Sequence, residues 1–293
     1  MKKIIILLPV YNDWESLNKV LTEINSVISI IKNFEFSCII INDASSANKP
    51  SVLKPDGFTD LKIINMKKNR GHARCNASGL RYIKKNSESY DYVIIMDSDG
   101  EDRPIEIRDL VKRIEDEPGV SVVAKRIKRS EGKLFQSLYQ IHKLTTLIFT
   151  GKKINFGNYS CLTKRDVSLI VEDESLWSSF SGCVKKNIKN YNEVESTRGL
   201  RYFGPSKMSM YNLAIHSLSI IGVFKYTVFL RSTFLIIILS FLIKLSFLVV
   251  VFLQILLIFF NLLVFITSMR ENKNALLKSH ENILNEEDIT HTE

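Results

Sequence analysis

One stretch of the sequence limits the possible folds more than any other, because residues 232–268 carry a single charged side chain, Lys244. As a helix rising about 1.5 Å per residue, these 37 residues greatly exceed the roughly 30 Å that a membrane core requires. Divided in two, they supply about 18 residues per span. We therefore predict a tight helical hairpin, and the alternative is a single long span that contains Lys244.

Basic residues flank this apolar stretch on both sides. Lys225 and Arg231 precede it, and Arg270, Lys273 and Lys278 follow it. Because Lys and Arg favour the cytoplasmic side of a membrane, both ends of a hairpin that crosses twice are expected in the cytoplasm. This predicts a multi-pass protein of the cytoplasmic (inner) membrane with a cytoplasmic catalytic domain.

The net charge of +9 is unevenly distributed. Residues 270–293 contain three Lys or Arg and six Asp or Glu, which leaves +12 on the rest of the chain. A basic body suits nucleic acid, an anionic membrane surface or phosphorylated substrates. The apolar stretch favours membrane lipid and phosphorylated substrates, so no nucleic-acid partner is predicted.

The first half of the chain alternates short apolar runs with helical patterns. Strand-like runs rich in Ile and Val occupy residues 4–8, 37–41, 61–64, 92–96 and 120–124. Helical patterns cover residues 17–31, 71–85 and 105–115. Such alternation predicts an α/β fold with a mainly parallel sheet, whose ligands bind at the carboxyl ends of the strands.

The sequence also suggests where the domains end. Residues 132–150 are again helical in pattern, and no linker rich in Pro or Gly separates them from the first half. We expect a catalytic domain over 1–205, a juxtamembrane region over 206–226, a hairpin over 227–269 and an acidic cytoplasmic tail over 270–293. The apolar and polar mixture at 208–224 fits an interfacial helix or a core helix equally well.

The strongest chemical signal is an apolar strand that runs directly into Asp97, Ser98 and Asp99. Carboxylates one residue apart lie on the same side of an extended backbone, where both can bind one hard cation through oxygen. A solvated Asp-Gly turn is the alternative. The four cysteines are too scattered for a zinc site or a disulfide framework, so we expect buried thiols.

Polar residues follow the other strands in the same way. The first strand ends at Pro9 and Tyr11, and the second ends at Asp43, which can accept hydrogen bonds from a base or ribose. Residues 69–74 open a helix, where free N–H groups and basic side chains suit phosphate. Each of these segments is weak evidence alone, but their order along the chain is informative.

In that order, the segments resemble the motifs of family 2 glycosyltransferases. Typical members show P-V-Y-N-E, V-D-D-G-S, N-x-G-x-x-x-A-x-x-x-G and a D-A-D-type motif, which here correspond to residues 9–13, 41–45, 69–79 and 97–99. The resemblance covers about the first 125 residues. It implies an inverting hexosyltransferase with a nucleotide-diphospho-sugar transferase (GT-A type) fold and a UDP- or GDP-linked sugar donor.

The resemblance also implies site residues. The nucleotide sugar is expected at Pro9, Tyr11, Asn12, Asp13, Asp43, Asn69, Gly71, Arg74 and Asp97. Mg²⁺ or Mn²⁺ is expected at Asp97, Asp99 and Glu101, and the catalytic residues are expected to be Asp97, Asp99 and Asp102.

A second resemblance concerns residues 201–207, which are similar to the R-x-x-G-x-S-K segment of polyprenyl-phosphate sugar transferases such as dolichol-phosphate mannose synthases. The basic run 125–129 corresponds to the acceptor loop of those enzymes. The resemblance implies that acceptor or donor phosphate is bound by Arg126, Arg201, Ser206 and Lys207. A basic surface turn and a solvated charge run are the alternatives.

Several positions depart from the family pattern. Asp13 replaces the usual Glu, Asn42 replaces the first acid of V-D-D-G-S, and Ala44 replaces its Gly, so base and ribose contacts are expected to be rearranged. Residues 155–160 lack the D-x-x-S-G-F-R pattern of many relatives. The Q-x-x-R-W segment of processive synthases is absent, which argues against a processive polymerase.

The mechanism depends on the acceptor. A lipid phosphate is already anionic near neutral pH and needs no strong base, whereas a sugar hydroxyl needs a carboxylate such as Asp102, Glu106 or Asp173. We expect polyprenyl (undecaprenyl) phosphate as the acceptor. A transferase that extends a lipid-linked glycan, and a non-catalytic nucleotide-binding membrane scaffold, are the alternatives, and a homo-oligomer is compatible with each of them.

Overall fold

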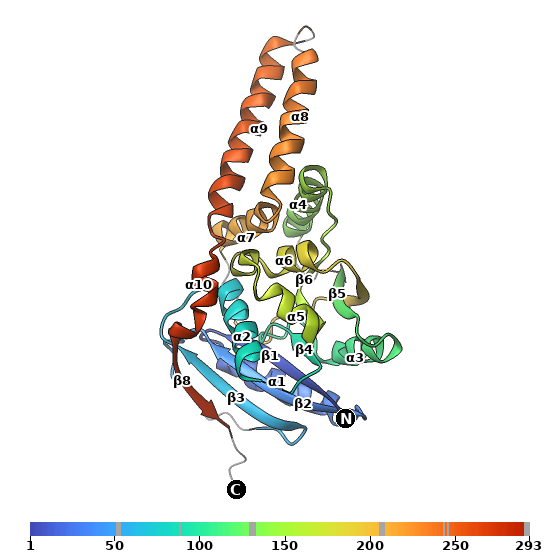
Figure 1. Cartoon of the computed structure of the whole chain (residues 1–293), viewed down its shortest axis with the longest axis vertical. Coiled ribbons are helices and arrows are strands. Elements are labelled where there is room, and N and C mark those ends of the chain that lie inside the picture. Colours follow the sequence, from blue (N-terminus) through green and yellow to red (C-terminus); the bar gives the residue numbers. More distant parts are fainter. Residues whose placement is uncertain are drawn as a thin grey trace.

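The computed structural model describes residues 1–50, 54–87, 89–128, 133–204, 209–242, 244 and 246–289. These residues form one eight-stranded sheet in the order β7-β5-β6-β4-β1-β2-β3-β8 (Figure 1). The strands are β1 (Lys2–Val10), β2 (Phe34–Asn42), β3 (Phe58–Met66), β4 (Tyr92–Ile95), β5 (Ser121–Lys128), β6 (Phe156–Thr163), β7 (Tyr191–Thr197) and β8 (Ile283–Asp288). Only β6 and β8 run against their neighbours, which confirms the predicted mainly parallel sheet in the described part of the chain.

Helices cover both faces of this sheet. The helices of the chain are α1 (Trp14–Ile28), α2 (His72–Asn86), α3 (Ile107–Asp116), α4 (Lys133–Thr150), α5 (Lys164–Ile170), α6 (Phe180–Asn187), α7 (Met210–Gly222), α8 (Lys225–Phe241), α9 (Phe247–Ser268) and α10 (Lys273–Leu277). Short 3-10 turns are η1 (Pro104–Glu106), η2 (Glu174–Trp177) and η3 (Ser279–Asn282). Helices α1 and α3 pack on one face, and α2, α5 and α6 pack on the other.

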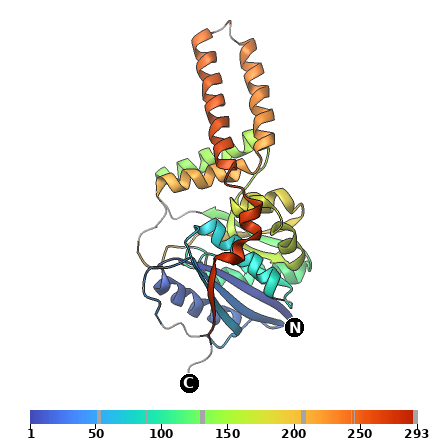
Figure 2. The same ribbon diagram turned by 60° about the vertical axis from the view of Figure 1, so that its left-hand side comes forward.

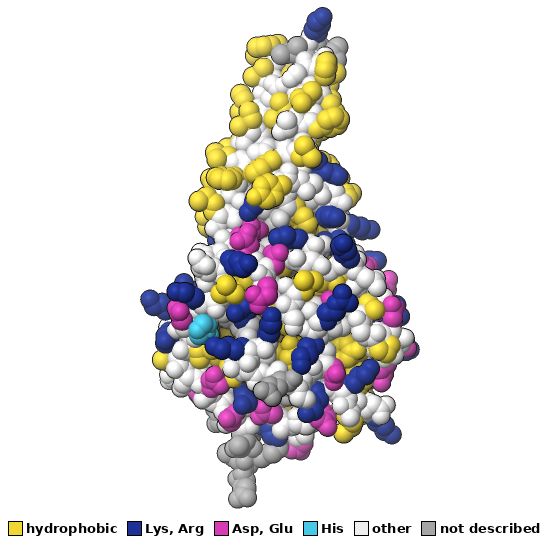
Figure 3. Space-filling view, viewed as in Figure 1, with side chains coloured by type: hydrophobic (Ala, Val, Ile, Leu, Met, Phe, Trp, Pro, Cys, Tyr) yellow, Lys and Arg dark blue, Asp and Glu magenta, His cyan; other side chains and the backbone are white. Residues whose placement is uncertain are grey.

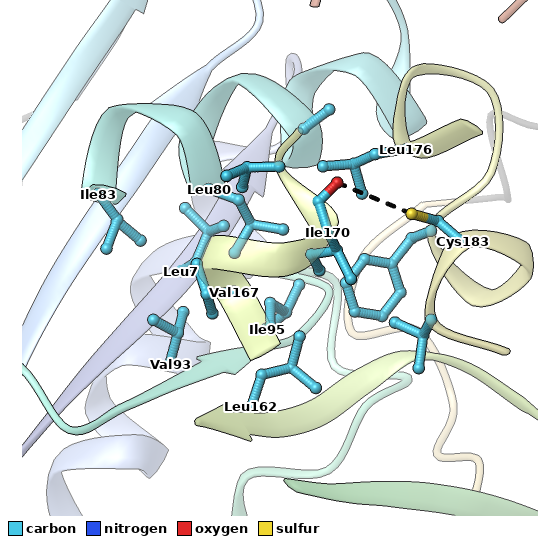
Figure 4. Packing of buried hydrophobic residues seen from close by; sticks show 14 of the residues in the cluster. Leu7, Leu80, Ile83, Val93, Ile95, Leu162, Val167, Ile170, Leu176 and Cys183 are labelled. Atoms are coloured by element: carbon cyan, nitrogen blue, oxygen red, sulfur yellow. Dashed lines mark hydrogen bonds between the residues drawn. The ribbon is translucent and has the colours of Figure 1, made fainter. Parts of the chain in front are cut away.

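Strand β1 lies in the middle of the sheet and is buried on both sides. Its residues Ile4, Ile6 and Leu8 pack toward α1, and its residues Ile5 and Leu7 pack toward α2. Figure 4 shows Leu7 among side chains of α2, α5 and β6. A run that is apolar at every position therefore fits a central parallel strand, as its composition predicted.

The four cysteines lie in the described part of the chain and are buried and free. The thiol of Cys183, a residue of α6, contacts the carbonyl oxygen of Ile170 in α5 at 3.8 Å within the core (Figure 4). The expectation of buried thiols is therefore confirmed.

The apolar stretch forms two antiparallel helices, α8 and α9, which project from the domain with Lys244 in the turn between them (Figures 1 and 2). Their apolar side chains are largely uncovered (Figure 3). In the described residues, one helix is long and apolar enough to cross a membrane, and α8 passes that test only together with α7, from which it bends by 87°. At 17 residues, α8 alone spans about 26 Å, which is less than a roughly 30 Å membrane core. Two crossings therefore stay a prediction.

Helices α4 and α7 lie side by side across the foot of the hairpin (Figure 2). The Phe149 ring of α4 packs on Phe260 of α9 with ring centroids 4.5 Å apart. The first half of α7 is mostly exposed and its last residues are buried, so its C-terminal part belongs to the core and an interfacial role for the rest stays a prediction. The apolar stripe of α4 remains uncovered, with Ile141 61% and Leu144 59% exposed.

After the hairpin, the chain returns to the sheet. Helix α10 and η3 lead into β8, which pairs antiparallel with β3 at the edge of the sheet (Figure 1). Part of the acidic segment that was expected to form a tail, Ile283–Asp288, is therefore a strand of the sheet.

Candidate active site

The predicted site residues converge at the carboxyl edge of the parallel strands. The Ser98 hydroxyl donates to the Pro9 carbonyl at 2.5 Å, and the Asp43 N–H donates to the Val10 carbonyl at 2.9 Å. These bonds join the loops that follow β1, β2 and β4. The topology thus brings together residues that are far apart in the sequence, as the strand order predicted.

Asp97 lies at the centre of the site. Its carboxylate lies 3.2 Å from His72 Nε2 and accepts a hydrogen bond of 3.2 Å from the Asn158 amide. Burial alone would raise the pKa of Asp97, but His72, Arg198 and Arg126 hold it well below its ordinary value. Asp97 in turn raises the pKa of His72, although burial opposes that rise.

Arg201 binds two carboxylates from different parts of the domain. One guanidinium nitrogen donates to Asp99 at 2.9 Å, and the other pairs with Asp13 at the start of α1. Burial and the neighbouring Asp97 raise the pKa of Asp99 to about 6, and Arg201 opposes this rise. A residue expected to meet phosphate therefore contacts two residues expected to meet the donor and the metal.

Asp102 is almost completely buried, with 3% of its surface exposed. It accepts the Asp97 N–H at 3.0 Å, and Arg126 approaches it at 4.0 Å. Burial and the Asp97 charge raise the pKa of Asp102 to about 8, so it is mostly protonated at neutral pH.

Glu101 is engaged by a separate cation, because its carboxylate forms an ion pair with Arg198. In the described residues, no group of three or more His, Cys, Asp or Glu side chains is arranged to hold a metal ion. The assignment of Mg²⁺ or Mn²⁺ to Asp97, Asp99 and Glu101 therefore stays a prediction.

The loop before α2 is held by Asp43. Its two carboxylate oxygens accept the N–H groups of Arg70 and Gly71, each at 2.9 Å. Burial raises the pKa of Asp43 above its ordinary value, and these hydrogen bonds partly offset the rise. Gly71 has φ +85°, and a Cβ at this position would meet no atom within 4 Å, so the glycine is needed for its backbone conformation.

Other residues predicted to bind the nucleotide sugar lie around this loop. Tyr11 is 42% exposed directly after β1, and Asn69 is exposed directly before Arg70 and Gly71. The Arg74 guanidinium lies 5.7 Å from the centroid of the Trp177 ring, and burial, with Arg270 nearby, lowers its pKa. Their contacts with a nucleotide stay predictions.

Other predicted groups lie outside this cluster. Ser206 and Lys207 fall outside the described residues. Glu106 accepts hydrogen bonds from the Ser196 hydroxyl at 2.7 Å and the Thr197 N–H at 3.0 Å. Asp173 caps η2 and pairs with a lysine of α6.

Several residues of the cluster are not among those predicted. His72 and Asn158 contact Asp97, and Arg198 pairs with Glu101. Burial, followed by the charges of His72 and Arg126, lowers the pKa of His216 in α7 to about 4. The position of His72 directly after the predicted Gly71 was an available signal, whereas Asn158, Arg198 and His216 lie in segments without a matching motif.

Comparison with known proteins gives distant relatives. The chain is 27% identical over 223 residues to an undecaprenyl-phosphate 4-deoxy-4-formamido-L-arabinose transferase of Serratia proteamaculans, covering 73% of this chain and 65% of that one. The protein of the same name from Proteus mirabilis is 24% identical over 222 residues, with the same coverage. The chain thus matches just under two thirds of the length of these relatives.

Solved structures also align with this chain, at low identity. Glucosyl-3-phosphoglycerate synthase of Mycobacterium tuberculosis, with Mn²⁺, UDP and its product, aligns at a TM-score of 0.48 and 12% identity, covering 77% of this chain and 80% of that chain. S. aureus TarS 1–349 with UDP-GlcNAc aligns at 0.48 and 14% identity, covering 84% and 74%. Residues 5–171, more than half of this chain, match the family described as Glycosyl transferase family 2, and the chain belongs to that family.

Proposed function

We propose that this glycosyltransferase moves a sugar, with inversion, from a nucleotide-diphospho-sugar to polyprenyl (undecaprenyl) phosphate at the cytoplasmic face of the inner membrane. One observation carries the proposal. Arg201, which pairs with Asp99 of the carboxylate cluster, lies in the segment directly before α7 in the sequence, and α7 and α4 present uncovered apolar side chains at the foot of the hairpin. A site in that position meets a phosphate held at the bilayer surface. The names of the relatives support this acceptor class.

A divalent metal fits the chemistry of the site. Asp97 and Asp99 offer hard oxygen ligands, and their mutual repulsion, which raises the pKa of Asp99, would be relieved by a cation. Mg²⁺ or Mn²⁺ bound there would neutralise charge on the leaving diphosphate. Arg201 already places a positive charge beside Asp99, because the two side chains form an ion pair.

The side chains that are present suit an anionic acceptor better than a hydroxyl. Among the bases predicted for a hydroxyl, Asp102 is buried and accepts the Asp97 N–H, Glu106 is bound by Ser196 and Thr197, and Asp173 caps η2. A lipid phosphate carries its own negative charge, so transfer requires positioning rather than proton removal. Arg126 lies beside Asp102 and supplies a positive charge for such a group.

The test uses the full chain in vesicles that contain undecaprenyl phosphate, with a panel of labelled UDP- and GDP-linked sugars. We expect one donor to label the lipid in the presence of Mn²⁺, with inversion at the anomeric carbon, and EDTA to stop the reaction. Label that appears only on added lipid-linked glycans would favour the alternative acceptor. Nucleotide binding without turnover would favour a scaffold, and oligomeric state is read from the same sample by light scattering.

A further inference from the structure

Strand β8 follows the hairpin in the sequence yet forms the edge of the sheet beside the donor-side loops. Several side-chain contacts hold it there. Lys62 of β3 pairs with Asp288 at 3.0 Å, and the Tyr82 hydroxyl donates to Glu286 at 2.6 Å. Because these contacts tie the strand to β3 and α2, its third acid, Glu287, is held in a defined place.

Glu287 begins a chain of hydrogen bonds that ends in the loop after β2. The Asn65 amide donates to Glu287 Oε1 at 2.6 Å, and the Asn42 amide donates to Asn65 Oδ1 at 2.8 Å. Asn42 Oδ1 then accepts the Ser45 N–H at 3.0 Å. The second oxygen of Glu287 pairs with Lys49, which lies farther along the same loop.

The chain of hydrogen bonds has only one consistent polarity. The pKa of Glu287 lies below its ordinary value, chiefly because of its bond with Lys49, so the carboxylate is ionised and only accepts. Asn65 must therefore turn its NH₂ toward Glu287 and its oxygen toward Asn42. Asn42 in turn presents its own oxygen to the Ser45 N–H, so the carboxylate orients both amides.

The loop that these hydrogen bonds reach is conformationally strained. Ala44 has φ +57° and Asn12 has φ +52°, both in the left-handed region that disfavours residues with a Cβ. The Asn12 N–H donates to the Ser45 hydroxyl at 2.9 Å, so the loops after β1 and β2 are joined at Ser45. Asp43, which organises the loop before α2, lies between Asn42 and Ala44. Fixing the side chain of Asn42 therefore also fixes Ser45, through which the loops after β1 and β2 are joined.

We propose that Glu287 of β8 is a positioning residue for the donor nucleotide, acting through Asn65 and Asn42 on the loop that contains Asp43. The inference rests on the proposed function, because it assumes that these loops bind the donor. It assigns to the segment after the membrane hairpin a part in donor binding. It also explains why Asn occupies position 42 in this chain, since an aspartate there would face the oxygen of Asn65.

The test is a double-mutant cycle between positions 42 and 287. Asn42→Asp alone places two acceptors face to face, so we expect a donor KM about tenfold higher, equivalent to about 1.4 kcal/mol, with acceptor KM unchanged. Glu287→Gln alone keeps an acceptor for Asn65 and should change donor KM less than threefold. In the double variant, the new amide at position 287 donates to the Asn65 oxygen, and the Asn65 amide donates to the new carboxylate at position 42. This reversed polarity should restore donor KM to within threefold of wild type.

Glu286→Gln is the matched control, because it removes the same charge one residue away from a carboxylate that bonds Tyr82 instead. It should leave donor KM unchanged. Melting temperature is measured for every variant. A general loss of folding would lower the melting temperature and would also change acceptor KM and kcat, whereas loss of donor positioning should change donor KM alone. Glu287→Ala, which cannot orient Asn65, should raise donor KM about tenfold like Asn42→Asp.

Calorimetry with UDP and GDP separates failure of the inference from failure of the proposed function. Wild type that binds neither nucleotide would overturn both. Wild type that binds one of them, together with Glu287→Ala that binds it equally well, would overturn the inference alone. Failure of Glu287→Gln to rescue Asn42→Asp would also overturn it, because rescue is the outcome that a purely structural role of β8 does not produce.

Discussion

Arg201 joins Asp13 to Asp99, and replacing it with alanine should destabilise the protein in a way that a divalent cation reverses. The three side chains are only 14–18% exposed, so water screens them weakly. Each charge-assisted hydrogen bond contributes about 1.5–3 kcal/mol. Residual hydration of the freed carboxylates reduces the sum, and we expect Arg201→Ala to lower the free energy of unfolding by about 2–4 kcal/mol.

The measurement is the melting temperature of the full chain in detergent, with EDTA and with Mn²⁺ plus UDP. In wild type, a cation at Asp99 must displace Arg201, whereas in Arg201→Ala it meets a free carboxylate. Mn²⁺ should therefore raise the melting temperature of the variant more than that of wild type, because binding to the folded state alone stabilises it.

Arg113→Ala is the control for this experiment. Arg113 also binds two partners, Glu117 at 3.1 Å and Asn192 at 2.8 Å, but it lies on α3, away from the carboxylate cluster. Its loss should lower the melting temperature by an amount that Mn²⁺ does not change relative to wild type. Equal Mn²⁺ shifts in wild type and Arg201→Ala would refute the idea that the arginine and a cation compete for Asp99.

Three further changes test other parts of the proposal. Asp99→Asn should abolish transfer and, because it removes one of the two ion pairs of Arg201, lower the melting temperature less than Arg201→Ala does; wild-type turnover that persists in excess EDTA would exclude the metal from the mechanism. Ile141→Asp combined with Leu144→Asp should weaken vesicle binding and raise KM for polyprenyl phosphate while leaving UDP affinity intact, as titration calorimetry would report. Ala44→Gly should stabilise the protein by about 0.5–1 kcal/mol because it relieves a φ of +57°, and a lower melting temperature would contradict this.

The sequence predicted the central strands and the hairpin because both are governed by local composition. Runs of Ile and Val at β1, β2 and β4 are buried on both faces of the sheet. The apolar side chains of α8 and α9 are largely exposed, because the rest of the domain does not cover them. The site motifs were placed by the same logic, since parallel strands bring their carboxyl ends together. Their roles toward nucleotide, metal and acceptor stay predictions.

Strand β8 could not be predicted in this way. Its sequence Ile-Leu-Asn-Glu-Glu-Asp has no apolar alternation, and it is held at the edge by its backbone pairing with β3 and by contacts of its acidic side chains, while Ile283 packs against the core. The contact of Arg201 with Asp13 and Asp99 is equally invisible in the sequence, because it joins residues brought together by the whole sheet. Pairings of this kind depend on tertiary geometry, which local pattern does not encode.

The order of segments along the chain links the membrane to both sides of the site. Residues 198–204, which include Arg201, precede the hairpin, and β8, which contains Glu287, follows it. At the foot of the hairpin, Lys225 pairs with Glu271 at 2.6 Å, so the start of α8 and the end of α9 are clamped together. This ion pair holds together the two points at which the chain enters and leaves the hairpin. In the proposed enzyme, the segment before the hairpin contacts the carboxylates through Arg201, and the segment after it contacts the donor loop through Glu287, so both flanks of the hairpin contribute to the site.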